Sequence, residues 1–195
     1  MNDSGGELSR SFYARPALEV APDLLNKVLV TDGCAGRIVE LEAYCGRDDP
    51  GSHAYRGPTP RTEVMFGPAG HLYVYFSYGV HWCANVVVDQ PGTAGAVLLR
   101  ALTPLRGIDL MEARRPAARR RRDLCSGPAK LTQSLAMDGA LDGVDLVGAS
   151  GGVTIVDDGT APPVRPGRST RVGLAKGQEM RWRWFVEDVE DVSRR

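Results

Sequence analysis

Residues 27–44 read KVLVTDGCAGRIVELEAY, two β-rich runs on either side of an Asp-Gly pair. Asp32-Gly33 favours a tight hairpin because glycine adopts a positive φ at no steric cost. We therefore predict two strands, Lys27–Thr31 and Gly36–Tyr44, joined by this turn. This hairpin is the clearest local structure in the chain, and the other elements are predicted outward from it.

The spacing of apolar residues predicts the remaining strands and helices. The expected strands are His71–Tyr78, Ala84–Val88, Ala96–Leu102, Val153–Val156 and Arg183–Val186. The expected helices are Ala21–Leu25, with proline in its first turn, Ile108–Ala118 and Lys130–Met137. Residues 47–60 are rich in proline and glycine, so we expect a long ordered loop of the kind that often carries function. The centre of the domain is predicted to be a sheet.

Length and composition fit one globular domain. The chain has 195 residues, of which 43% are hydrophobic and 25% charged, so it can bury a core without disulfides or metal ions. We expect a flexible segment at residues 1–15, one domain over residues 16–188 and a tail at residues 189–195. The 24 basic and 24 acidic residues cancel, which argues against a protein that coats nucleic acid through its overall charge.

The cysteines and the N-terminus indicate the compartment. No two of the four cysteines have the close spacing of zinc ligands, so we expect a reduced cytosolic protein. The first ten residues lack the apolar run of a signal peptide, and no window approaches the roughly 18 apolar residues of a membrane span. His53, His71 and His81 do not have the spacing of a helical metal pair, so metal catalysis is a weak option.

Two glutamates interrupt the strand after the Asp-Gly turn. By the two-residue period of a strand, Ile38, Glu40, Glu42 and Tyr44 share one face. Glutamate is a poor strand former, so the carboxylates mark either a solvated face or a functional site. Arg100 lies among apolar residues of another strand, and a buried guanidinium needs a charged partner. Glu40 or Glu42 can supply it; the alternative is an edge-strand arginine that reaches solvent.

Aromatic and basic clusters suggest a surface that stacks bases, but they also have ordinary explanations. Five of the six tyrosines, Tyr44, Tyr55, Tyr73, Tyr75 and Tyr78, lie within 35 residues, which suits either base stacking or core packing. Six arginines lie within residues 114–122, a pattern that suits either a solvated face or contact with phosphates. The absence of a serine nucleophile elbow, a Walker loop and a dinucleotide fingerprint argues against hydride and phosphoryl transfer.

The order of several short motifs carries a family resemblance. These motifs are RIVELEAY at residues 37–44, His53, TPR at 59–61, MF at 65–66, LYVY at 72–75, YG at 78–79, CAN at 83–85, LLRA at 98–101 and CSGPAKL at 125–131. In this order they resemble the alkyladenine (3-methyladenine) DNA glycosylase family. The resemblance runs from about residue 17 to residue 186 and includes RVG at residues 171–173.

The resemblance implies a fold and an activity. The implied fold is α+β (mixed α/β), a single compact domain with a curved antiparallel sheet or partial barrel surrounded by helices. The implied activity is that of a monofunctional bacterial DNA glycosylase, which flips a damaged purine out of duplex DNA and hydrolyses its N-glycosidic bond to start base excision repair. The purines are 3-methyladenine, 7-methylguanine, hypoxanthine and ethenoadenine. We further expect a monomer in the cytoplasm near the nucleoid, with no cofactor, metal ion or membrane contact.

Seven residues match positions with a role in the family. Glu42 matches the general base that deprotonates the attacking water, and Arg100 matches the residue that positions this water and the carboxylate. Tyr44 and Tyr75 match the aromatic walls that sandwich the flipped base, and His53 completes the pocket. The other matches are Tyr78, which is pushed into the duplex, and Asn85, which crowds the amino group of guanine. We also expect two basic residues, Arg61 and Lys130, to contact DNA.

The sequence leaves two alternatives open. Lys130 can act as a Schiff-base nucleophile in a bifunctional glycosylase and lyase, although phosphate contact at a helix start is a simpler role. The chain can also be a non-catalytic module that recognises damaged DNA by shape and stacking. Val80 and His81 follow the Tyr-Gly pair where family members often carry a larger side chain, which leaves the damage spectrum open. Glu40 has no matching role and is expected to give structural or electrostatic support.

Overall fold

The described part of the chain is organised around one sheet of nine antiparallel strands. The structure is a computed structural model that describes residues 6–148 and 150–193. Its strands are β1 (Gly6–Glu7), β2 (Val28–Thr31), β3 (Cys34–Cys45), β4 (Leu72–Ser77), β5 (His81–Val88), β6 (Gly95–Arg106), β7 (Val153–Asp157), β8 (Gly167–Ser169) and β9 (Arg183–Phe185). Its α-helices are α1 (Arg10–Tyr13), α2 (Ala17–Leu24), α3 (Ile108–Arg114) and α4 (Pro128–Ser134). Short 3-10 helices are η1 (Gly46–Asp48), η2 (Glu63–Phe66), η3 (Arg121–Asp123) and η4 (Gly139–Leu141).

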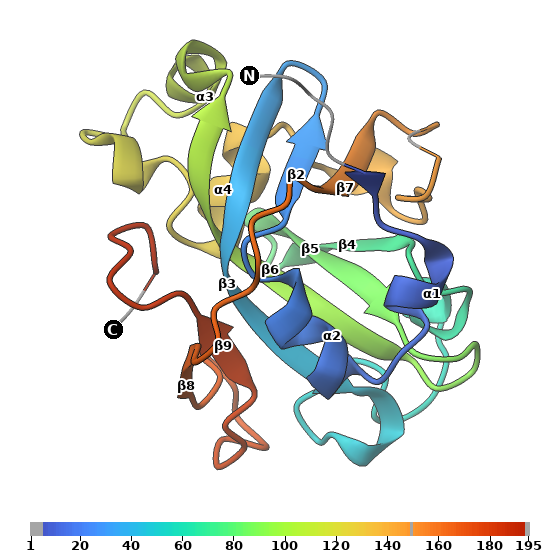
Figure 1. The fold of residues 1–195 in the computed structure, drawn as a ribbon. Helices are drawn as coiled ribbons and strands as arrows, with labels where there is room; N and C mark the ends of the chain where they lie inside the picture. Colours follow the sequence, from blue (N-terminus) through green and yellow to red (C-terminus); the bar gives the residue numbers. More distant parts are fainter. Residues whose placement is uncertain (1–5, 149, 194–195) are drawn as a thin grey trace.

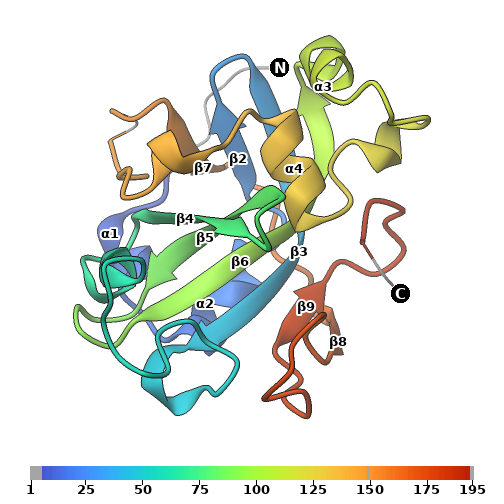
Figure 2. The same cartoon turned by 180° about the vertical axis from the view of Figure 1, so that it is seen from behind.

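The two longest strands lie side by side through the length of the molecule (Figure 1). The sheet order is β1-β7-β2-β3-β6-β5-β4, and β9 pairs with the second half of β3 and carries β8 at its other edge. The sheet curls into a half barrel, with α2 packed against β3 and β6 on one side and α4 against β5 and β6 on the other (Figures 1 and 2). The predicted α+β fold with a curved antiparallel sheet in a single compact domain is confirmed.

The hairpin at Asp32-Gly33 forms as predicted. Residues of β2 and β3 pair in register up to the turn, where Gly33 has a φ of +77°. Glycine is required at this position because other residues are strained at such a φ. The hairpin places β3 at the middle of the sheet, between β2 and β9 on one edge and β6 on the other.

A bulge in β3 changes which residues share a face. The partners of Ile38 and Glu40 on β6 are adjacent residues, so Val39 is an extra residue in the ladder. Ile38 therefore packs in the main core, whereas Glu40 and Glu42 reach Arg100. The prediction that Ile38 shares a face with the two glutamates is wrong, because strict alternation holds only in a strand without a bulge.

The helices differ from their predicted limits for local reasons. α2 begins at Ala17 instead of Ala21, so Pro22 lies in its second half and not in its first turn. Ala17, Val20, Ala21 and Leu24 are all buried, an apolar stripe with helical spacing that starts before the proline. α3 ends at Arg114, two residues before a proline that would interrupt it, and α4 begins two residues earlier than predicted. No helix within residues 6–148 and 150–193 is long and apolar enough to cross a bilayer.

The predicted loop after β3 is held against the sheet by a small core of its own. Ala54 and Met65, from the loop and from η2, pack with Tyr73, Val87 and neighbouring residues of the sheet. These apolar contacts fix the position of residues 46–66, so the side chains of this loop have defined places beside β4.

Both ends of the described part of the chain, near residues 6–13 and 191–193, pack on the domain. β1 pairs with β7, and Tyr13 of α1 is fully buried, within the segment that was expected to be flexible. At the other end, Val192 is 9% exposed, within the predicted tail. The expectations for residues 1–5 and 194–195 lie outside the described residues.

Candidate active site

A cavity of about 790 Å³ gathers most of the predicted site residues. It lies where the β4–β5 hairpin, the loop of residues 46–66, the start of α4 and residues 172–174 meet. Its lining includes Tyr44, His53, Arg61, Tyr75, Tyr78, Asn85 and Arg100. Glu42 and Lys130 are not part of the lining. The cavity is of the size that holds a small molecule or a single base.

Glu42 lies directly behind this lining, with none of its surface exposed. Its Oε2 accepts a hydrogen bond from the Tyr44 hydroxyl at 2.9 Å, and its Oε1 accepts one from the main-chain N–H of Val172 at 2.7 Å. Arg100 Nη1 lies 3.2 Å from the same Oε1. Three lining residues from three segments therefore hold one buried carboxylate.

Glu40 shares Arg100 with Glu42 but has more donors. Arg100 Nε donates to Glu40 Oε1 at 2.8 Å, and Arg183 Nε donates to the same oxygen at 2.7 Å. Ser193 adds its main-chain N–H at 2.6 Å and its hydroxyl at 2.8 Å. Arg100 is thus the buried arginine with carboxylate partners that the strand pattern predicted, and both glutamates are its partners.

The two glutamates differ in the direction of their pKa shifts. Burial raises the pKa of Glu42 above its usual value, and the opposing charge of Arg100 does not cancel this effect. Burial acts in the same direction on Glu40, but Arg100, the Ser193 amide and Arg183 together outweigh it and lower the pKa of Glu40. Glu40 is therefore held as a structural anion, while Glu42 takes up a proton more readily.

Tyr44 links the cavity to a buried ion pair. The guanidinium of Arg171 lies over the Tyr44 ring, with its central carbon 4.6 Å from the ring centroid. Arg171 and Asp49 have fully buried side chains, and Arg171 Nη2 donates to Asp49 Oδ1 at 2.7 Å. Burial and the neighbouring Glu42 raise the pKa of Tyr44 well above its usual value, so its hydroxyl remains a hydrogen-bond donor.

Another part of the cavity lining is a set of packed rings. Tyr73 and Tyr75 are stacked with centroids 5.3 Å apart, and His53 meets Tyr75 edge-on at 4.6 Å. His53 Nδ1 lies 3.1 Å from the Tyr73 hydroxyl. Burial, with Arg61 nearby, lowers the pKa of His53, so its ring is neutral at pH 7. The Arg61 guanidinium lies 5.3 Å from the Tyr75 centroid.

Asn85 and Cys83 contribute to the same cavity from β5. Asn85 is 4% exposed and donates from Nδ2 to the main-chain oxygen of Tyr73 at 3.2 Å. Cys83 pairs with Tyr75 across the strands, and burial raises the pKa of its thiol. Both side chains are held by the sheet, so this part of the cavity is rigid.

Tyr78 stands at the tip of the β4–β5 hairpin. Its side chain is 88% exposed, and the next apolar residue, Val80, is 71% exposed. Tyr78 has a φ of +49° and Gly79 a φ of +69°, so the turn holds a bulky residue in a conformation that tyrosine rarely adopts. The hairpin therefore presents an aromatic ring at the mouth of the cavity.

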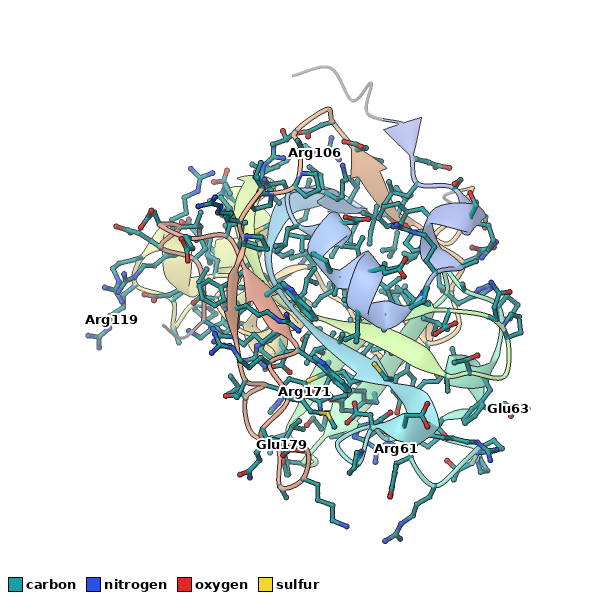
Figure 3. The ribbon with its side chains drawn as sticks, turned by 60° about the horizontal axis from the view of Figure 1, so that its bottom comes forward. Arg61, Glu63, Arg106, Arg119, Arg171 and Glu179 are labelled. Carbon is teal, nitrogen blue, oxygen red and sulfur yellow. The ribbon has the colours of Figure 1, made fainter. Side chains whose placement is uncertain are left out.

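Lys130 and the arginine run have partners inside the protein. Lys130 Nζ donates to the hydroxyl of Ser126, which lies two residues before α4, at 3.2 Å. Four arginines of residues 114–122 donate to other residues of the chain: Arg114, Arg115, Arg120 and Arg121. Arg119 points outward at the left edge of the molecule, away from Arg61 at the bottom of the view (Figure 3). The run therefore helps to fasten α3 and η3, while Arg119, Arg120 and Arg121 remain exposed at the surface.

Three contributors to the site were missed by the sequence reasoning. Val172 supplies a main-chain N–H to Glu42, while Arg171 and Asp49 support Tyr44 from behind. The available signal was the RVG motif at residues 171–173, which was recognised without a role. The main-chain N–H of Val172 could not be predicted as a donor from the identity of its side chain.

Comparison with known proteins identifies the class of enzyme. Residues 11–190 match the family model described as methylpurine-DNA glycosylase. This match defines a DNA glycosylase, a hydrolase of N-glycosyl bonds. The chain belongs to the methylpurine-DNA glycosylase family, and the predicted resemblance is confirmed.

Relatives from distant bacteria are similar over almost the whole chain. A protein of Burkholderia lata is 56% identical over 190 residues, which cover 97% of this chain and 92% of that protein. A protein of Streptomyces avermitilis is 46% identical over 192 residues, covering 95% and 90%, and one of Carboxydothermus hydrogenoformans is 47% identical over 195 residues, covering 96% and 99%. All three carry the name "Putative 3-methyladenine DNA glycosylase".

Proposed function

We propose that this enzyme removes 3-methyladenine and other damaged purines from duplex DNA as a monofunctional glycosylase, with Glu42 as its general base. The observation that carries the proposal is the buried Glu42 carboxylate directly behind a cavity walled by Tyr44 and Tyr75. An enzyme that acts on a base must take it out of the stack, and aromatic rings replace the stacking that is lost.

The contacts of Glu42 suit the activation of a water molecule. A carboxylate can accept about four hydrogen bonds. Tyr44 and Val172 use two of these positions, and Arg100 lies beside Oε1 as an ion-pair partner. The remaining capacity can serve a water molecule. In the step we propose, water oxygen bonds to C1′ of the sugar, the base leaves with the electrons of the N-glycosidic bond, and the water proton passes to Glu42.

The environment of Glu42 fits this acceptor role. Burial raises the pKa of Glu42, which strengthens it as a base, while the charge of Arg100 acts in the opposite direction and favours the ionised form. A methylated purine is cationic and leaves readily, so one carboxylate suffices. The sugar gains positive charge as the bond breaks, and the Glu42 anion stabilises it.

The exposed residues around the cavity suit a duplex as partner. We propose that Tyr78 enters the duplex and fills the space left by the flipped nucleotide, while Arg61 and Lys130 contact phosphates. Asn85, rigid at the cavity wall, crowds the amino group of normal guanine. The wider substrate set of 7-methylguanine, hypoxanthine and ethenoadenine, and action as a monomer in the cytoplasm, are parts of the same proposal.

The test is release of free base from methylated duplex DNA by wild type and by Glu42→Gln. Because glutamine cannot accept the water proton, the variant should bind the DNA normally and release base at least about 100-fold more slowly. The matched control is Glu63→Gln on η2, an exposed glutamate outside the cavity lining, which should retain wild-type release. Base release by Glu42→Gln at the wild-type rate would reject Glu42 as the base.

Borohydride trapping and the base-release assay together distinguish the two alternatives from the proposed function. A lyase that uses Lys130 forms a Schiff base that borohydride traps on DNA, and we expect no trapped product because Lys130 is not in the cavity lining. A non-catalytic module would bind damaged DNA with neither protein releasing base. Either result would contradict the proposed function.

A further inference from the structure

The last described residues of the chain return to the buried charges behind the cavity. Asp191 accepts a hydrogen bond from the Thr103 hydroxyl at 2.7 Å, which fastens the segment to β6. Two residues later, Ser193 donates its main-chain N–H and its hydroxyl to the two oxygens of Glu40. The C-terminal segment of residues 191–193 is therefore tied to both β3 and β6.

Ser193 also contacts the arginine that serves Glu42. Arg100 Nη2 donates to the Ser193 hydroxyl at 3.2 Å, and Arg100 Nε donates to Glu40 at 2.8 Å. The third nitrogen, Nη1, lies 3.2 Å from Glu42. A guanidinium is planar with fixed N–H directions, so partners on two nitrogens determine where the third one points.

We propose that Ser193 is a positioning residue, which acts with Glu40 to orient Arg100 so that Nη1 is directed at Glu42. The inference rests on the proposed function, since it concerns the group that acts as base there. The family model matches residues 11–190, so Ser193 lies beyond the matched region. The orientation of Arg100 therefore depends in part on the C-terminal segment of residues 191–193.

Loss of the Ser193 hydroxyl should change the pKa of Glu42, because Ser193 contacts Arg100 and Arg100 contacts Glu42. The charged and titratable groups near Glu42 are Arg100 on β6, Glu40 and Tyr44 on β3, Cys83 on β5 and Arg171 beside residue 172. Of these, Ser193 contacts Arg100 and Glu40. When Arg100 is less well directed, less positive charge faces Glu42, so its pKa rises and the acid limb of the rate profile moves to higher pH.

The experiment compares single-turnover base release from methylated duplex DNA across the acid limb. The variants are Ser193→Ala and the isosteric pair Ser193→Val and Ser193→Thr, of which only the last keeps the hydroxyl. The matched control is Ser134→Ala, because the buried Ser134 hydroxyl donates to the Leu124 oxygen at 2.7 Å. This control loses a comparable hydrogen bond on another element. Thermal unfolding accompanies each measurement.

We expect Ser193→Ala and Ser193→Val to lower the plateau rate about tenfold, the loss of one hydrogen bond to a charged group. Their acid limb should move up by about half a pH unit, with unchanged DNA affinity. Ser193→Thr should restore both values, and Ser134→Ala should lower the melting temperature without moving the limb.

The outcomes separate this inference from the proposed function. If wild type releases base but the limb and rate of both hydroxyl-free variants equal those of wild type, the positioning role is overturned while the function stands. A shift of the limb in Ser134→Ala would also overturn it, since general destabilisation would then explain the effect. If wild type releases no base, the proposed function itself fails.

Discussion

Glu40 and Glu42 lie two positions apart on β3 but differ in the hydrogen-bond donors that surround their carboxylates. Glu40 is saturated by arginines and by Ser193, whereas Glu42 has fewer donors and faces the cavity lining. A residue of the same type can thus be an anchor or a base, and its donors decide which. This difference is invisible in the sequence, where both are glutamates within one strand.

The buried pair of Asp49 and Arg171 gives a prediction at this scale. Asp49→Asn leaves the Arg171 charge uncompensated in a fully buried place, so the free energy of unfolding should fall by about 3 kcal/mol. Urea unfolding measures the change. The matched control is Asp158→Asn, which breaks a partly exposed pair with Arg37 and should cost less than about 1 kcal/mol. Equal losses in the two variants would contradict the argument.

Residue chemistry predicted the side chains of the site better than its main-chain contacts. An arginine amid apolar residues of β6 required a carboxylate partner, and Glu40 and Glu42 provide it. The family motifs indicated which side chains line the cavity. The amide of Val172 could not be predicted, since every residue except proline carries the same donor and only the fold decides which one meets Glu42.

At the scale of elements, the β4–β5 hairpin combines strain and exposure. Tyr78 has a φ of +49° and is 88% exposed, an arrangement that lowers stability and is typical of functional positions. Asparagine tolerates this φ better than tyrosine. At this position a residue that tolerates a positive φ would favour stability, whereas the proposed function needs an exposed aromatic ring.

The variant Tyr78→Asn should affect stability and base release in opposite directions. We expect an equal or higher melting temperature, together with base release slowed about tenfold or more because the side chain proposed to fill the space of the flipped nucleotide is lost. Single-turnover release and thermal unfolding measure the two effects. Val164→Ser serves as the control, since Val164 is 98% exposed and outside the cavity lining. A similar slowing in that control would show that the loss is not specific to the hairpin tip.

Elements were predictable where local chemistry determines them. The Asp-Gly turn and the alternating runs indicated every strand from β2 to β7 and β9, with small errors at their ends. The bulge at Val39 was not predictable, because it depends on pairing with β6 and leaves the pattern of β3 unchanged. The limits of α2 were misjudged because a proline was taken as the start of a helix whose apolar stripe begins five residues earlier.

At the scale of the whole molecule, Glu42 lowers stability at neutral pH. Its folded-state pKa is raised, so the folded protein binds the proton more tightly than the unfolded chain does. The stabilisation from protonated Glu42 is complete below the unfolded value, near 4.5, and is lost as the pH rises through the folded value. The ionised carboxylate of the proposed base is thus unfavourable for the stability of the fold.

Glu42→Gln should remove this pH dependence. The free energy of unfolding of wild type, relative to that of the variant, should decrease as the pH rises from about 4.5 through the window above it. Urea unfolding at a series of pH values measures the difference. Glu63→Gln, which alters an exposed carboxylate, should show no such trend. A difference between wild type and Glu42→Gln that stays constant with pH would contradict the raised pKa.

Length and composition predicted a globular domain but not the use of its charges. The net charge of zero hides an uneven distribution, in which arginines such as Arg100, Arg171 and Arg183 are buried with carboxylates or carbonyl groups. The docking of Ser193 on Glu40 joins residues 153 positions apart. Such contacts depend on the folded topology, which composition does not contain.

Cys83 places a thiol inside the cavity of an enzyme whose proposed substrates arise when electrophiles methylate DNA. Thiolates react with the same electrophiles, whereas protonated thiols react far more slowly. Burial raises the pKa of Cys83, so at neutral pH its sulfur remains protonated. The packing that shapes the cavity therefore also lowers the reactivity of the Cys83 thiol towards the methylating agents that produce the proposed substrates. The enzyme can then keep this thiol unmodified while such agents are present.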